Sequence, residues 1–195
     1  MQHPNRKLRN YKKLYQLYDA GTVFTALDTE TTSLSPRDGR IIEIGAVKFS
    51  KDGIIDKCQS LFYSECSLPP IITKITHITD QMLSDAPEIS GYIPFFYSFI
   101  KDTVLIAHNA QFDLNFINAE FQKASYPPST NKFIDTLDYS RYLFPEIKSH
   151  RLDFLADSFK IDKGSSHRAF DDAVTCMELF KYCIKFSFGE PLSGL

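Results

Sequence analysis

The first half of the chain carries short hydrophobic runs separated by turn residues, and this pattern predicts three β-strands. The runs cover residues 22–27, 40–49 and 54–63. Turns separate the runs at residues 35–39 and 50–53, and the Asp-Gly pair in the second turn is typical of a hairpin. We therefore expect the three strands to form a meander.

From Pro69 onward the apolar residues recur mainly at helical spacing. One further strand is expected at residues 103–107 and another that ends at Asp135. The pattern predicts helices at residues 71–76, 88–100, 110–123, up to Leu143, 152–159 and 169–186. A meander followed by alternating helices and strands is typical of an α/β domain. The expected architecture is a mixed five-stranded sheet with helices on both faces.

The first twenty residues contain five basic residues and a single acid, Asp19. Their apolar residues recur at helical spacing, which predicts a basic amphipathic helix within an N-terminal extension, residues 1–20. The apolar side of this helix fits packing on the domain, and the basic side fits contact with a partner or a nucleic acid. The domain itself is expected at residues 21–188, followed by a short tail, residues 189–195.

A chain of 195 residues that is 43% hydrophobic and 24% charged is long enough for one well-filled core. Its N-terminus lacks an apolar targeting segment, and its most apolar stretch, residues 92–107, is interrupted by Lys101 and Asp102. We therefore expect a cytoplasmic protein without a membrane segment. The formal charge of -2 does not by itself indicate nucleic-acid binding, but divalent ions bound by a group of acids would reverse the sign locally.

Two acids, Asp28 and Glu30, directly follow the first hydrophobic run. Residues two apart in a strand point to the same face, so the two carboxylates would lie side by side. Like charges at this separation repel unless a proton, a cationic side chain or a metal ion lies between them. The pair therefore indicates either a solvated strand end or part of a metal site.

Three more candidates lie where a predicted strand or loop meets a helix. Asp113 falls in the first turn of a predicted helix, where the helix dipole alone also favours an acid. His167 precedes the last helix and Asp172 falls in its first turn, so the histidine is able to reach over the acids. We choose Asp172 over Asp171 because Asp172 shares a helical face with Cys176. Taken alone, His167 also fits an ordinary surface loop residue.

Three motifs combine these candidates in order along about residues 22–186. They resemble the DnaQ-like (DEDDh) family of 3′→5′ exonucleases, and within it they look most like the proofreading exonucleases of bacterial DNA polymerase III, as epsilon subunit or PolC-type domain. Ser33 and His77 stand where the family commonly has Gly. The motifs are Asp28-x-Glu30-Thr31-Thr32, His108-Asn109-Ala110-x-Phe112-Asp113 and His167-x-Ala169-x-x-Asp172.

The resemblance implies a ribonuclease H-like fold and a two-metal mechanism. Two divalent cations, Mg²⁺ or Mn²⁺, about 3.5–4 Å apart would clamp the scissile phosphate. Carboxylates are the hard ligands that these ions prefer, and the implied ligands are Asp28, Glu30, Asp113 and Asp172. His167 would act as the general base that takes a proton from the attacking water.

The resemblance also implies a substrate, the single-stranded or frayed 3′ end of DNA, and hydrolysis that releases nucleoside 5′-monophosphates. A DNA polymerase subunit is the implied partner. Two alternatives are an RNA 3′-end-trimming exoribonuclease of the same family and a non-catalytic adaptor that binds nucleic acid or a polymerase. The residues expected around the terminal nucleotide are Thr31, Leu34, His108, Asn109 and Phe112.

Overall fold

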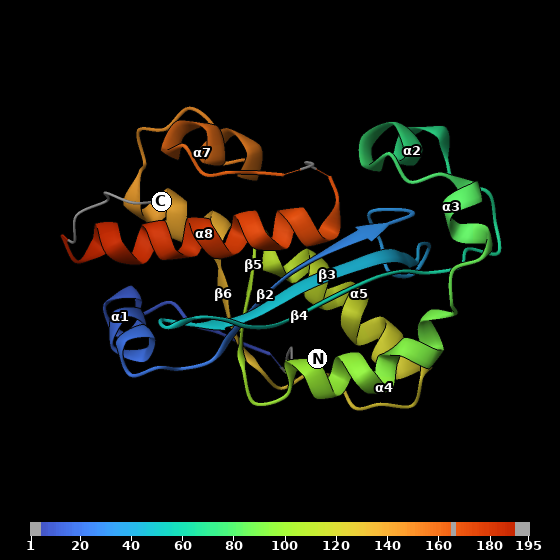
Figure 1. Ribbon diagram of the computed structural model, residues 1–195, viewed down its shortest axis with the longest axis horizontal. Coiled ribbons are helices and arrows are strands. Elements are labelled where there is room, and N and C mark those ends of the chain that lie inside the picture. The colour runs from blue at the N-terminus through green and yellow to red at the C-terminus, as the bar shows by residue number, and fades with distance from the viewer. Residues whose placement is uncertain (1–4, 165–166, 190–195) are drawn as a thin grey trace.

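The computed structural model describes residues 5–164 and 167–189. It is an α/β domain built on one mixed sheet in which the strands follow the order β1-β6-β5-β2-β3-β4 (Figure 1). The strands are β1 (Arg6–Lys7), β2 (Phe24–Thr31), β3 (Ile41–Ser50), β4 (Gly53–Leu61), β5 (Val104–Ala107) and β6 (Lys132–Asp135). The predicted α/β class and mixed sheet are confirmed, with six strands in place of the expected five.

The additional strand, β1, comes from the N-terminal extension, in which only a helix was expected. It pairs in parallel with β6, where Arg6 lies opposite Lys132. Two polar residues make no hydrophobic pattern, so the strand has no signature in the sequence. The predicted helix follows it as α1 (Tyr11–Asp19), and the side chain of Leu14 in that helix is fully buried.

Helices cover both faces of the sheet (Figure 1). The face that carries Phe24 and Ala26 packs against α6, α7, α8 and α1, whereas Leu27 belongs to the cluster formed with α4 and α5. This alternation follows from the two-residue period of a strand. No helix in residues 5–164 or 167–189 is long and apolar enough to cross a membrane. The helices after α1 are α2 (Pro70–Thr76), α3 (Asp80–Ser84), α4 (Ile89–Ile100), α5 (Ala110–Lys123), α6 (Thr136–Leu143), α7 (Leu152–Phe159) and α8 (Ala169–Ser187).

β2 lies at the centre of the sheet, antiparallel to β3 and parallel to β5. The strand was expected to end at Leu27, but it continues to Thr31 because β3 pairs with it as far as Ile41. The acidic pair therefore lies within the strand, next to a register shift between Glu30 and Thr31. α5 directly follows β5, and α8 packs across β2 and β3, so both helices begin near this end of β2.

Candidate catalytic site

Asp28 and Glu30 lie in the last part of β2, and both are half-buried. Burial, reinforced by the neighbouring carboxylates, raises the pKa of Glu30 to about 8. Burial also raises the pKa of Asp28 well above its usual range, with Asp113 as the strongest charged neighbour. Carboxyl groups that hold their protons this strongly repel one another when ionised, and a divalent cation relieves that repulsion.

Asp113 comes from the first turn of α5 and is only 2% exposed. Its Oδ1 accepts a hydrogen bond from the backbone N–H of Thr29 at 3.0 Å and another from Thr29 Oγ1 at 2.8 Å. Burial raises the pKa of Asp113 to about 7 although these bonds favour the charged form. Strand β2 therefore holds the Asp113 carboxylate in place and also carries Asp28 and Glu30.

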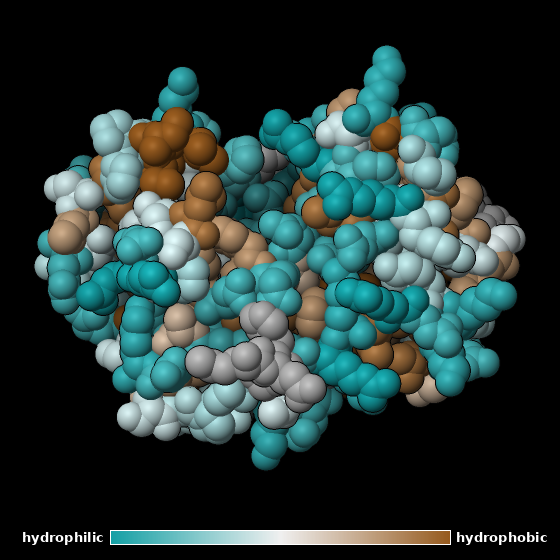
Figure 2. All heavy atoms as spheres, turned by 180° about the vertical axis from the view of Figure 1, so that it is seen from behind, coloured by the Kyte–Doolittle hydropathy of each residue, from teal (hydrophilic) through white to brown (hydrophobic). Residues whose placement is uncertain are grey.

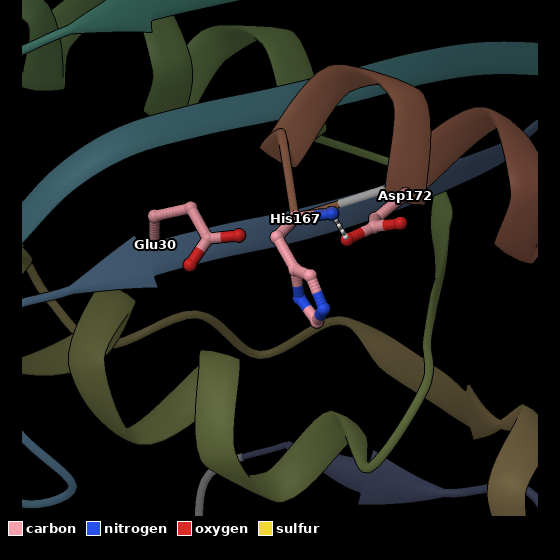
Figure 3. A group of neighbouring side chains, drawn as sticks. All are labelled: Glu30, His167 and Asp172. Carbon is pink, nitrogen blue, oxygen red and sulfur yellow. Dashed lines mark hydrogen bonds between the residues drawn. The ribbon is translucent and has the colours of Figure 1, made fainter. Parts of the chain in front are cut away.

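His167 and Asp172 come from the start of α8. The backbone N–H of His167 donates a hydrogen bond to Asp172 Oδ2 at 3.0 Å. The backbone of His167 is left-handed, with φ of 62°, which is uncommon for a residue other than Gly. Figure 3 shows His167 between Glu30 and Asp172. One ligand atom from each of the three residues lies within 4.8 Å of the other two.

The donor set fits divalent cations. None of the four acids forms an ion pair with a basic side chain in the part of the chain that the structure describes. Carboxylate oxygens suit Mg²⁺ or Mn²⁺ better than zinc, which prefers thiolates and imidazoles. Glu30, His167 and Asp172 form the compact group, whereas Asp28 and Asp113 stand outside it.

Two residues that follow the acidic pair were predicted to contact the terminal nucleotide. Thr31 is buried, and its Oγ1 donates to the backbone oxygen of Ser33 at 2.7 Å. Leu34 is 90% exposed. The Leu34 side chain is therefore accessible to a ligand, while the Thr31 hydroxyl is already used within its own loop. Their roles in substrate binding stay predictions.

His108, the third predicted substrate contact, is tied into the fold through both ring nitrogens. Nε2 donates to the backbone oxygen of His150 at 2.7 Å, and Nδ1 lies 3.0 Å from Thr136 Oγ1. Burial lowers the pKa of His108, which favours the neutral ring. These contacts join the end of β5 to the start of α6 and to the loop before α7.

Asn109 and Phe112, the remaining predicted contacts, also have structural roles. Asn109 has a left-handed backbone with φ of 67°, and its backbone N–H donates to Asp135 Oδ1 at 3.0 Å. The rings of Phe112 and Phe116 lie 5.1 Å apart, centre to centre, on the same helix. A contact between either side chain and a substrate stays a prediction.

The two departures from the family pattern are accommodated locally. His77 ends α2 with φ of 58°, the left-handed conformation in which Gly has no steric penalty. Ser33 Oγ donates to the backbone oxygen of Ser35 at 2.9 Å and accepts its N–H at 3.1 Å. Ser33 therefore stabilises the turn after the acidic pair.

A cleft of about 580 Å³ lies beside the acids, and sequence reasoning missed its basic lining. Asp28, His108, His167 and Asp172 line one part of it. The surface is hollowed between the ends of the molecule that carry α2 and α7, and both hydrophilic and hydrophobic residues lie at its rim (Figure 2). The cleft also has three cationic side chains, which lie 21 residues or more from the nearest motif acid in the sequence, so only the fold brings them to the cleft. They are Arg141, Lys148 and Arg151.

Comparison with protein families gives one decisive match. The model of the RNase_T family, described as Exonuclease, matches residues 25–180. The chain belongs to this exonuclease family. All three motifs fall inside the matched range, and the predicted membership among DnaQ-like 3′→5′ exonucleases is confirmed. The segment that forms β1 and α1 lies outside it.

Relatives of this exonuclease domain are replication proteins. The DNA polymerase III subunit epsilon of Treponema pallidum is 46% identical over 159 residues, which is 80% of this chain and 74% of that protein. The PolC-type DNA polymerase III of Halalkalibacterium halodurans is 43% identical over 150 residues, 77% of this chain. The match spans only 10% of the PolC-type protein. The similarity to both forms of polymerase III exonuclease that the motifs indicated is thus confirmed.

Solved structures show the same fold. A complex of E. coli ExoI with single-stranded DNA, in its zinc-bound form, superposes on this exonuclease domain with a TM-score of 0.76 at 21% identity. The similarity covers 86% of this chain and 41% of the ExoI chain. E. coli exonuclease I with a dT13 oligonucleotide gives a TM-score of 0.74 at 20% identity. At this identity the likeness establishes the fold, which is the predicted ribonuclease H-like arrangement.

Proposed function

We propose that this chain is a DNA 3′→5′ exonuclease of the proofreading type, acting on the single-stranded or frayed 3′ end. The observation that carries the proposal is the group of Glu30, His167 and Asp172 beside Asp28 and Asp113 at one end of β2. The family membership and the polymerase III relatives support the same reaction. The product would be a nucleoside 5′-monophosphate.

The four carboxylates would hold two Mg²⁺ or Mn²⁺ ions, which supply Lewis-acid stabilisation of charge on the reacting phosphate. His167 takes a proton from the attacking water, whose oxygen forms the new bond to phosphorus. The bond between phosphorus and O3′ of the preceding nucleotide breaks, and that oxygen leaves as the new 3′ hydroxyl after gaining a proton from solvent. Asp172 supports this step by fixing the His167 backbone through the bond to its N–H.

Substrate contacts are assigned by chemistry. Arg141 and Lys148 line the cleft beside Asp28 and form no ion pair among the described residues, which suits them to phosphates of the strand. Leu34, exposed just beyond β2, would pack against a base near the 3′ end. The sugar preference follows from contacts to the 2′ position, so the test includes RNA.

The test is a nuclease assay on 3′- and 5′-labelled single-stranded DNA, mispaired duplex DNA and short RNA, each with Mg²⁺ and with Mn²⁺. The expected result is stepwise loss of nucleotides from the DNA 3′ end, absent in EDTA and in Asp172→Asn. Asp171→Asn is the matched control and should keep activity, because Asp171 lies outside the acidic group. Full activity in EDTA, or a clear preference for RNA, would contradict the proposal.

The partner that we propose is a DNA polymerase III subunit, in line with the epsilon relative. Arg9, Lys12 and Lys13 lie exposed on β1–α1, outside the family match, and are the candidate contact residues. Removing the whole segment is a poor test because Leu14 belongs to the core. Replacing the three cations with Glu should abolish co-purification with the polymerase subunit and leave nuclease activity unchanged. Retained co-purification would exclude this surface.

A further inference from the structure

Glu43 is a fifth carboxylate near the site, and the metal-binding hypothesis does not use it. It lies on β3 directly across from Glu30 on β2, and it is fully buried. A buried carboxylate needs hydrogen bonds and an opposite charge. Glu43 has both: Gln59 Nε2 donates to it at 3.2 Å, and the remaining donors all come from the residues that begin α8.

Arg168 supplies the opposite charge. Its Nε lies 3.3 and 3.2 Å from the two carboxylate oxygens of Glu43, and its Nη2 lies 2.8 Å from Oε1. The backbone N–H of Ala169 donates to Oε2 at 3.1 Å. A charge-assisted contact with several hydrogen bonds fixes the orientation of the Arg168 side chain as well as its distance from Glu43. The first residues of α8 are therefore anchored to β3 at one carboxylate.

The backbones of β3 and α8 also touch at this point. A Cβ atom added to Gly45 would lie 2.2–2.3 Å from backbone atoms of Ala169 and Phe170, so only Gly fits there. Gly45 is two residues along β3 from Glu43, on the same face. The anchor and the close approach together set where α8 begins relative to the sheet.

His167 immediately precedes this anchor and has its left-handed backbone. Such a conformation costs about 1–3 kcal/mol and persists only where the surroundings hold it. On one side the His167 N–H is bound by Asp172, and on the other side Arg168 is bound by Glu43. The imidazole thus projects from a short segment that is held at both ends, beside Glu30.

We propose that Arg168 and Glu43 form a positioning pair that aims the His167 ring at the reacting water. The proposal rests on the proposed function, in which His167 is the general base. Arg168 acts through His167 and contacts neither the metal ions nor the substrate. Misplacing a catalytic group by about 1 Å costs up to about 100-fold in rate, so the pair has a measurable effect on turnover.

The decisive test is a double-mutant cycle between Arg168→Gln and His167→Ala, with kcat, KM and Mn²⁺ affinity measured at a temperature where all variants are folded. Arg168→Gln should lower kcat about 10- to 100-fold in the wild-type background and less than about twofold when His167 is already Ala. KM and Mn²⁺ affinity should change less than about twofold. An equal loss of kcat in both backgrounds, or a raised KM with kcat unchanged, would overturn the proposal.

A second cycle does not depend on the residual activity of His167→Ala. Glu43→Gln should lower kcat by about the same factor as Arg168→Gln, and the double variant should lose no more than either single variant. The double variant removes both charges and leaves no uncompensated buried carboxylate, so we expect it to be less destabilised than Arg168→Gln. Additive losses in this cycle would also overturn the proposal. Arg168→Lys should recover part of kcat.

Arg40→Gln is the matched control, because Arg40 forms a 3.7 Å ion pair with Glu65 in which both side chains are exposed. It should leave kcat and the melting temperature unchanged. Wild-type protein without metal-dependent nucleotide release would refute the proposed function itself. Active wild-type protein without coupling in either cycle would refute only the positioning role.

Discussion

The starts of α5 and α8 share one sequence spacing and differ in what the structure does with it. The spacing His-x-Ala-x-x-Asp occurs at residues 108–113 and again at residues 167–172. Both copies deliver an aspartate from the first helical turn toward β2. At α5 the histidine has both ring nitrogens engaged by the fold, whereas at α8 the histidine lies between two carboxylates.

The backbone conformation at the two helix starts differs by a shift of one residue. The left-handed residue at α5 is Asn109, one position after the histidine, and at α8 it is His167 itself. The carboxylates differ as well: Asp113 is fixed by Thr29 of β2, while Asp172 binds the loop of its own helix. The α5 copy thus builds the fold and supplies a rigid acid, and the α8 copy supplies the accessible chemistry. Identical spacing does not give identical roles.

The two histidines provide the largest expected contrast. His167→Ala should lower kcat by about 10²–10⁴-fold, the range for removal of a general base, with little change in melting temperature. His108→Ala should lose far less turnover and should lower the melting temperature, because it removes contacts to Thr136 and His150. Steady-state kinetics and thermal melts of both variants test this. A larger loss of kcat in His108→Ala would reverse the roles assigned to the two helix starts.

Asp113 and Asp172 should differ in how strongly they make the stability of the metal-free protein depend on pH. A carboxyl group whose pKa is higher in the folded than in the unfolded protein stabilises the fold at low pH. This stabilisation is complete below the pKa of the unfolded state and is lost as the pH rises through the pKa of the folded state. The pKa is about 7 for Asp113 and about 8 for Glu30 in the folded protein. The melting temperature in EDTA should therefore fall as the pH rises from about 4 to 8. Mg²⁺ should reverse the fall at pH 8.

The variants sharpen this second prediction. Asp113→Asn should flatten the pH dependence in EDTA more than Asp172→Asn, because Asp113 is the more deeply buried of the two. Thermal melts across pH 4–9, with and without Mg²⁺, measure the effect. A metal-free protein that becomes more stable toward pH 8 would contradict the assigned direction of the pKa shifts.

Gly45→Ala tests the packing of the α8 start. The added Cβ would clash with the backbone of Ala169 and Phe170. We therefore expect the free energy of unfolding to fall by about 1–3 kcal/mol. Gly91→Ala is the matched control, since Gly91 lies in α4 with open space around the added methyl and Ala favours a helix. Urea unfolding of both variants measures this. Equal stability of the two variants would contradict the close approach of β3 and α8.

Lys7→Met tests the support of the α5 start and should give the smallest effect. Lys7 Nζ binds the buried Asp135 at 3.0 Å, and Asp135 in turn accepts the backbone N–H of Asn109. We expect a loss of about 1–2 kcal/mol, or about 2–8 °C in melting temperature. Lys51→Met, which removes an exposed 3.8 Å pair with Asp19, should change stability by less than about 0.5 kcal/mol. Equal losses of stability in Lys7→Met and Lys51→Met would contradict a role of Lys7 in supporting the start of α5.

The order of strands and helices could be predicted from the sequence because each long element carries its own hydrophobic period. The acids could be located because strand ends and helix starts of an α/β sheet meet at one edge. Asp172, which was chosen over Asp171 for the helical face it shares with Cys176, lies close to Glu30 and His167, and its catalytic role stays a prediction. These inferences needed only local patterns and one topological rule.

Other features depend on contacts between distant parts of the chain. Glu43 and Arg168 lie 125 residues apart, and nothing in either neighbourhood marks them as partners. The His108 ring bonds to the backbone oxygen of His150, which lies 42 residues further along the chain. The sequence motif alone could not show that this ring nitrogen already has a hydrogen-bond partner. The strand β1 has too few residues to form any pattern. Long-range pairing, rather than local propensity, decides each of these cases.

The pairing of β1 with β6 has a consequence for the order of folding. The hydrogen bond between Asn5 and Ser129 spans 124 residues, so this edge of the sheet closes only after most of the domain has been synthesised. The backbone N–H groups of Arg6 and Leu8 donate to Asn131 and Phe133 and help to hold the short strand. We expect their amides to exchange with solvent before those of β2. Detachment of this edge would free Asp135 from its lysine and loosen the Asn109 turn, while the central strands stayed paired.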